Sequence, residues 1–269
     1  MRIRRHLLIT AAALAAATAC VSEPNPRTQA PPVAPPVAAA PLPAPEPEPF
    51  DARLLARLSA TAPDLRREVL ELALRARECA LAYGDVQGDS RLAVIDYSLP
   101  STSERLWVFD LAGGRLLYRE HVAHGRNSGH NMTTSFSNVD GSHQSSLGLF
   151  RTAETYVGGN GYSMRMDGLE PGVNDNARDR LIVMHGAPYV NPEQAARQGR
   201  LGRSYGCPAV RSAVAREVID VLKDGQLLFA YYPQQDWLAG SKFLECRPAL
   251  VAAAGRRRAG GAGLHVAVH

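Results

Sequence analysis

RLIVMHGAPYVNPEQAARQGRLGRSYGCPAV, residues 180–210, joins an apolar, strand-like run ending at His185-Gly186 to a Gly-rich turn that carries Cys207. Seventeen residues separate Gly186 from Ser204, enough for the chain to leave a sheet, fold back and bring imidazole and thiol together. An imidazole that accepts the thiol proton turns a cysteine into a nucleophile at neutral pH. This stretch predicts Cys207 as a nucleophile and His185 as its base.

The neighbours of Cys207 fit acyl transfer. Gly206 has no side chain to obstruct a substrate, and the turn places the amides of Gly206 and Cys207 to donate to an oxyanion. Pro208 stiffens the turn. An isolated cysteine and histidine are more often a buried apolar residue and an interior histidine, but the glycine neighbours favour the catalytic interpretation.

The rest of the chain predicts a mainly β body with short helices. Helical periodicity covers residues 51–83, where Pro63 opens the second of two helices and Gly84 ends it. Further helices are expected at residues 192–198 and 212–223. Strand-like runs between turn signals occur at residues 91–99, 105–111, 115–125, 147–156, 180–187 and 226–233.

The N-terminal residues have the layout of a secretory signal, with three arginines ahead of an apolar run and small residues. Ala17-Thr18-Ala19-Cys20 fits an ordinary signal peptidase site and also a weak lipobox, in which Cys20 becomes lipidated and attaches the protein to the membrane. We expect an exported, periplasmic or cell-envelope protein. The predicted parts are a signal at 1–20, a Pro/Ala-rich linker at 21–50, a helical segment at 51–84, the main domain at 85–247 and a disordered tail at 248–269.

Charge and composition argue against a nucleic-acid partner. The formal charge is +4, but it falls to +1 without Arg2, Arg4 and Arg5 of the signal and to −2 without the three arginines at 256–258. Aromatic residues make up only 6% of the chain, so neither a basic face nor a stacking surface is expected.

The four cysteines predict at most one structural disulfide. Cysteines tend to pair in an oxidising compartment. With Cys20 at the processing site and Cys207 kept free, Cys79 and Cys246 remain as a pair.

Residues 185–210 resemble the His-Gly…Ser-X-Gly-Cys signature of the L,D-transpeptidase catalytic domain, the YkuD-like murein enzymes. Residues 92–111, 121–150 and 167–187 resemble the murein L,D-transpeptidase branch, so the similarity runs from about Arg91 to Pro233. The resemblance implies an L,D-transpeptidase-like β-sandwich or barrel as the catalytic domain at 85–247, preceded by the helical segment.

The resemblance also implies roles and a reaction. Cys207 is the nucleophile, His185 the base and the Gly186 carbonyl the group that orients the imidazole, with Ser204 and Gly206 in the site. The thiolate attacks the third residue of a peptidoglycan tetrapeptide stem, expels D-Ala, and passes the acyl group to an amine of a neighbouring stem as a 3→3 crosslink. No metal or cofactor is implied.

The substrate pocket departs from the family pattern. Tyr205 stands where a second histidine is common, and Pro208-Ala209 replaces an aliphatic residue followed by Arg or Asn. His124, Asn176, Arg178 and Tyr205 are the candidate substrate-binding residues, since a guanidinium fork suits a peptide carboxylate. A zinc site among His121, His124, His130 and His143 is not favoured, because the i, i+3 interval of the first two suits a helix and the segment is strand-like.

Three alternatives stay open. The same site would serve an L,D-carboxypeptidase that uses water, or an enzyme that tethers or releases a wall-bound protein, because acceptor choice depends on pocket shape. A non-catalytic wall-binding lipoprotein is the alternative of another class, but it has no need for a nucleophile and a base. Papain-like wall peptidases place Cys before His along the chain, whereas here His185 comes first.

Overall fold

The computed structural model describes residues 51–86 and 90–246. The expected signal, linker and C-terminal tail lie outside the described residues. None of the described helices is both long enough and apolar enough to cross a membrane.

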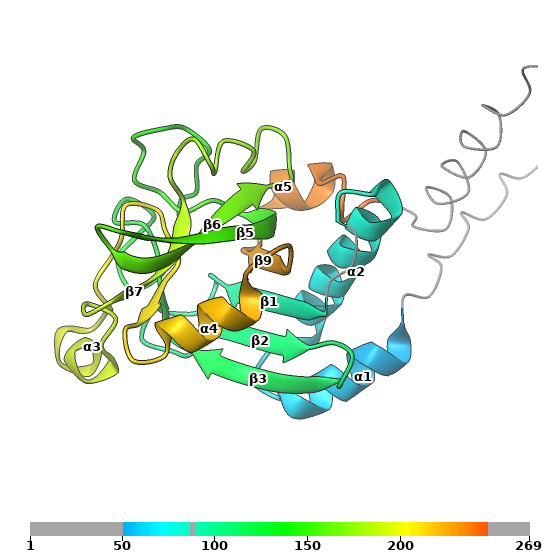
Figure 1. Cartoon of the computed structure of the whole chain (residues 1–269), viewed down its shortest axis with the longest axis horizontal. Coiled ribbons are helices and arrows are strands. Elements are labelled where there is room, and N and C mark those ends of the chain that lie inside the picture. The colour runs from blue at the N-terminus through cyan, green and yellow to red at the C-terminus, as the bar shows by residue number, and fades with distance from the viewer. Residues whose placement is uncertain (1–50, 87–89, 247–269) are drawn as a thin grey trace, which may run out of the picture. The chain divides into compact units, whose positions relative to one another are not determined.

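The body is one mixed sheet of nine strands in the order β3-β2-β1-β9-β5-β6-β7-β8-β4. Figure 1 shows the sheet with β1, β2 and β3 on one side of β9 and β5 and β6 on the other. The edge strands β3 and β4 are separated in the chain by His121 alone, so the two edges return to the same place and the sheet is nearly closed. The mainly β fold with short helices is confirmed. The strands are β1 (Arg91–Asp96), β2 (Leu106–Asp110), β3 (Arg115–Glu120), β4 (Val122–Ala123), β5 (Gly148–Gly158), β6 (Gly161–Gly168), β7 (Val183–Ala187), β8 (Ala209–Arg211) and β9 (Leu227–Tyr231).

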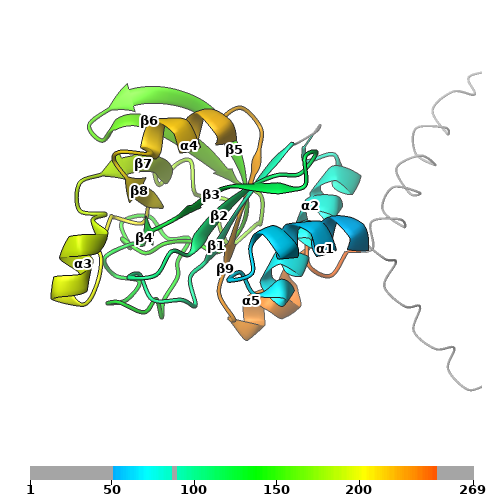
Figure 2. The same ribbon diagram turned by 90° about the horizontal axis from the view of Figure 1, so that it is seen from below.

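The central strands are buried on both faces. Every residue of β2 and β9 is buried, as is β1 after Arg91, a pattern typical of strands covered on two sides. Helix α2 (Arg67–Tyr83) contacts β1, β5 and β9, and α4 (Ala215–Leu222) contacts β1, β6 and β7. Figure 2 shows α2 with α1 (Ala52–Thr61) and α5 (Gln235–Gly240) on one side of the molecule, with α3 (Pro192–Gln198) at the opposite end.

Local signals explain where the helices begin and end. Asp51 caps α1 through its side chain, and Asn191 caps α3, whose first residue is Pro192. Gly84 ends α2 in the left-handed region with a φ of 77°. The predicted disulfide is confirmed: Cys79 of α2 is joined to Cys246, with their Cα atoms 6.0 Å apart.

The structure adds three elements to the predicted set: β6, β8 and α5. The sequence of β6, GYSMRMDG, is poor in β-branched residues, and it forms a strand because β5 and β7 hydrogen-bond it on both sides. Helix α4 begins at Ala215, three residues later than expected, because Ala209–Arg211 is used as β8 and pairs with β7.

Candidate functional site

The turn before β8 is held by two serine hydroxyls. The Ser204 hydroxyl accepts from the Gly206 N–H at 3.1 Å and donates to the Cys207 carbonyl at 2.7 Å. The Ser145 hydroxyl accepts from the Gly125 N–H and donates to the Gly206 carbonyl, both at 3.0 Å. These bonds fix the backbone on either side of Cys207.

Gly206 is required by its backbone and by its surroundings. Its φ is 126°, which side-chain-bearing residues rarely adopt. A Cβ here would also lie 2.8 Å from the Gln144 carbonyl oxygen and 2.9 Å from Ile182 Cδ1. The turn can therefore pass close under the loop before β5 only with glycine at this position.

Cys207 carries a free thiol that is partly exposed. Its Sγ accepts from the Val183 N–H at 3.5 Å and contacts the Leu181 carbonyl at 3.6 Å. Burial raises the pKa of the Cys207 thiol, while the Val183 N–H and the positive charge of Arg180 act in the opposite direction. The sulfur thus sits in an apolar setting with a nearby cation.

His185 lies on β7, next to the strand that follows Cys207. It is 3% exposed, and in the parallel β7–β8 ladder it is paired with Ala209. Its Nδ1 is 3.0 Å from the Gly186 carbonyl oxygen, which can only accept, so Nδ1 carries the proton and Nε2 of the neutral ring is the basic atom. Burial lowers the pKa of His185. No hydrogen bond joins this ring to the thiol of Cys207.

Arg180 is a residue of the site that the sequence did not indicate. It directly precedes Leu181, whose carbonyl contacts Sγ, and its guanidinium is half-buried against the loop over residues 137–146. The only sequence feature that could have indicated Arg180 is its position directly before the apolar run that ends at His185.

In the structure, the Ser204 side chain and the Gly206 N–H hold the turn in shape. Ser204 is 6% exposed, and both of its side-chain hydrogen bonds close the turn. The Gly206 N–H was expected to be free for an oxyanion, but the Ser204 hydroxyl occupies it. The Cys207 N–H acts on its own sulfur, where it helps to lower the thiol pKa.

Two candidate substrate-binding residues differ sharply in exposure. Tyr205 is 64% exposed and adjacent to Cys207, with the His143 ring tilted against it at a centroid distance of 4.5 Å and the Arg126 guanidinium over its ring at 5.5 Å. His124 is fully buried, and Arg105 Nη2 donates to its Nδ1 at 2.7 Å. The structure therefore places His124 in the interior and Tyr205 at the surface beside the thiol.

Asn176 and Arg178 lie in a turn and already have partners. The Asn176 amide groups bind Asn138, and the Arg178 guanidinium pairs with Glu154 and Asp167. Two carboxylates thus compete with any peptide carboxylate for Arg178. Within residues 51–86 and 90–246, no three His, Cys, Asp or Glu side chains are grouped to hold a metal ion.

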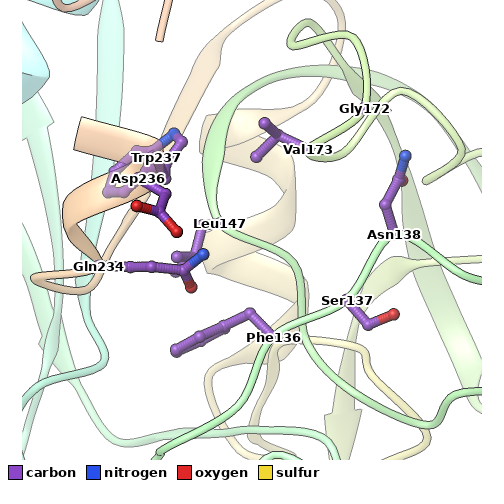
Figure 3. A pocket seen from close by; sticks show the side chains of 9 residues that line it. All are labelled: Phe136, Ser137, Asn138, Leu147, Gly172, Val173, Gln234, Asp236 and Trp237. Carbon is purple, nitrogen blue, oxygen red and sulfur yellow. The ribbon is translucent and has the colours of Figure 1, made fainter. Parts of the chain in front are cut away.

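A cavity of about 300 Å³ lies against the loop that Arg180 contacts. Figure 3 shows Gln234, Asp236 and Trp237 from the α5 region on one side and Phe136, Ser137 and Asn138 from a loop on the other. Neither Cys207 nor His185 lines it, but the Ser137 carbonyl accepts from Arg180. The remaining lining residues are Leu147, Gly172 and Val173.

Residues 61–231 match the model of one family, described as the L,D-transpeptidase catalytic domain. The matched range contains His185 and Cys207 and most of the described structure. A search of curated proteins gave no match.

Solved structures of L,D-transpeptidases are similar over part of the chain. One from Mycobacterium smegmatis is 14% identical with a TM-score of 0.34, and the aligned part covers 54% of this chain and 60% of the M. smegmatis chain. One in complex with imipenem is 16% identical with a TM-score of 0.32 and the same two coverages. One from Xylanimonas cellulosilytica is 15% identical with a TM-score of 0.31, covering 54% and 62%. This chain thus spans about 60% of the length of these structures.

Proposed function

The chain belongs to the L,D-transpeptidase catalytic domain family, and from that premise we propose that it is an exported peptidoglycan transpeptidase forming 3→3 crosslinks through a thioester on Cys207. One observation carries the proposal beyond the family. A free, partly exposed thiol sits on a fixed turn beside the strand of a neutral, buried imidazole whose Nε2 is available as a base.

The first half-reaction acylates Cys207. The pKa directions leave both thiol and imidazole neutral near pH 7, so His185 Nε2 takes the thiol proton as Sγ attacks the carbonyl carbon of the third stem residue. The new C–S bond replaces the amide C–N bond, and D-Ala leaves with the proton from the imidazolium. The Gly186 carbonyl supports the proton on Nδ1 throughout.

The second half-reaction releases the acyl group. A side-chain amine of another stem, typically of diaminopimelate, attacks the thioester and gives its proton to Nε2. The C–S bond breaks and Sγ regains a proton. If water takes the place of the amine, the product is a tripeptide and the enzyme is an L,D-carboxypeptidase.

Product analysis separates the possible activities. The purified protein is incubated with disaccharide-tetrapeptide muropeptides, and the products are identified by mass spectrometry. A 3→3 dimer is the expected product, and Cys207→Ala is expected to reduce its rate by about 10³-fold or more, since the nucleophile is lost. The matched control is Ser135→Ala, a small change in the loop before β5.

The outcome that contradicts crosslinking is a tripeptide without a dimer, which identifies a carboxypeptidase. No change in the muropeptides, with wild type and Cys207→Ala alike, favours a wall-binding protein. One of the solved relatives was determined with imipenem, so a carbapenem adduct on the Cys207 peptide is a further expected result, and a peptide without adduct counts against the assignment.

A further inference from the structure

Among the described residues, the hydrogen-bond partners of the Arg180 guanidinium are all neutral groups. Its Nη1 donates to the Ser137 carbonyl and the Ser146 hydroxyl, each at 2.6 Å, and its Nη2 donates to the Gln144 carbonyl at 2.8 Å and the Ser142 hydroxyl at 3.1 Å. Its Nε is buried without a hydrogen-bond partner in the described part of the chain. Within residues 51–86 and 90–246, no carboxylate makes an ion pair with this half-buried charge.

Two backbone carbonyls, those of Leu181 and Gln144, connect Arg180 to Cys207 and its turn. The residue after Arg180 is Leu181, whose carbonyl contacts Sγ at 3.6 Å. The Gln144 carbonyl that accepts from Arg180 also lies against Gly206, the residue before the nucleophile. The backbone at Leu181 and at Gln144 therefore connects Arg180 to the turn that carries Cys207.

The other titratable groups that act around the thiol are neutral at pH 7. Burial raises the pKa of Tyr97 and raises that of Tyr189 to about 12, and burial lowers the pKa of His185. Asp140 acts electrostatically on Arg180 but makes no ion pair with it. Among the described residues, Arg180 is thus the charged side chain that lowers the pKa of the Cys207 thiol.

We infer that Arg180 is a positioning residue that stabilises the negative charge formed on Cys207. Through its hydrogen bonds to residues 137–146, it also fixes the loop that packs against the turn carrying Cys207. The inference rests on the proposed role of Cys207 as the nucleophile. When the S–H proton moves to His185 Nε2, the charge left on Sγ faces a fixed cation whose field the apolar surroundings screen poorly. No other reactant is required.

The test measures the thiol directly, without peptidoglycan. The full chain, with its disulfide intact, is treated with iodoacetamide over a range of pH, and the rate at Cys207 gives its pKa. Arg180→Met is expected to raise that pKa by about one unit, which slows alkylation near pH 7 about tenfold. Arg180→Lys keeps the charge and is expected to restore most of the rate.

Two control variants separate charge from loop packing. Arg165 lies opposite Val183 in the β6–β7 ladder and pairs with Glu154, so Arg165→Met removes a neighbouring but neutralised charge. Ser146→Ala removes one hydrogen bond of Arg180 and keeps its charge. Neither is expected to shift the thiol pKa. A shift in Ser146→Ala as large as in Arg180→Met, or no shift in Arg180→Met, overturns the inference.

A measurement on the unaltered side chain covers the case in which Arg180→Met fails to fold. The ¹⁵Nε resonance of Arg180 is expected to move with the titration of Cys207 in the wild-type protein and to lose that inflection in Cys207→Ser. An unchanged inflection contradicts the inference. Because neither readout uses muropeptides, a protein with the thiol shift but no crosslinking disproves the proposed function and leaves the role of Arg180 standing.

Discussion

The α1–α2 side of the molecule and the Cys207 side are held together by different forces. On the first, Leu58, Val69 and Leu70 are fully buried in the main apolar core, and the Cys79–Cys246 disulfide ties α2 to the end of the described chain. On the second, the Ser145 hydroxyl of the loop before β5 donates to the Gly206 carbonyl of the turn before β8, and the Ser204 hydroxyl closes that turn.

The arginines show the difference most clearly. Arg66, near α2, pairs with the fully buried carboxylate of Asp96, whereas the hydrogen bonds of Arg180 within the described part of the chain all go to neutral oxygens. A cation paired with a carboxylate exerts little net field on other groups, while an unpaired one remains available to an anion formed during a reaction. The first side therefore supports the fold, and the proposed role of Cys207 places the charge that forms in the reaction on the second.

Removing the disulfide should produce the largest change in stability and spare the chemistry. Cys79→Ala with Cys246→Ala is expected to lower the free energy of unfolding by about 2–5 kcal/mol, because the unfolded chain gains freedom. Urea unfolding measures this loss, and iodoacetamide alkylation of Cys207 under native conditions is expected to be unchanged. A parallel fall in alkylation would show that the two sides are not separable.

Ser145→Ala should have the opposite pattern, with a large change in the reactivity of Cys207 for a modest loss of stability. It leaves the Gly125 N–H and the Gly206 carbonyl without their hydroxyl partner, at a cost of about 1–3 kcal/mol, and it loosens the turn that presents the thiol. The alkylation rate of Cys207 is expected to change more, relative to its stability loss, than in the disulfide variant. Ser135→Ala in the same loop is the control. Equal changes in the alkylation rate from the two substitutions would show that Ser145 has no special role in fixing the turn of Cys207.

A third effect concerns acid stability and depends on His124, which is fully buried. Burial, with the neighbouring charge of Arg105, lowers the pKa of His124 to about 3. The unfolded chain takes up a proton there below about pH 6.5 and the folded chain does not, so stability falls as pH drops from about 6.5 to about 3, by at most about 1.4 kcal/mol per pH unit.

Urea unfolding at pH 7 and pH 5 measures this dependence. His124→Gln is expected to flatten it, while His130→Gln, a change of an exposed side chain, should follow the wild type. Identical slopes for wild type and His124→Gln would mean that His124 is protonated alike in the folded and unfolded chains.

Local patterns in the sequence were enough to predict the elements with strong periodicity or caps. The helix at 192–198 has Asn191 and Pro192 at its start and Gly199 at its end, residues that are typical of helix ends. The apolar runs of β1, β2 and β9 indicate buried strands. The pairing of Cys79 with Cys246 followed from counting cysteines.

Features set by distant contacts were not predictable in this way. β6 owes its conformation to β5 and β7, and the occupied Gly206 amide depends on the rotamer of Ser204. The burial of His124 depends on Arg105, and the position of Arg180 depends on carbonyls more than thirty residues away. No periodicity in a single sequence encodes such contacts.

The return of β3 and β4 to one place also bears on aggregation. An open sheet offers two rows of unpaired N–H and C=O groups, on which a second chain can add a strand. Here one edge strand, β4, has only two residues, and the Arg211 guanidinium of its neighbour β8 pairs with Glu120 at the end of β3. Rolling the sheet up thus leaves little template for edge-to-edge association between copies of the protein.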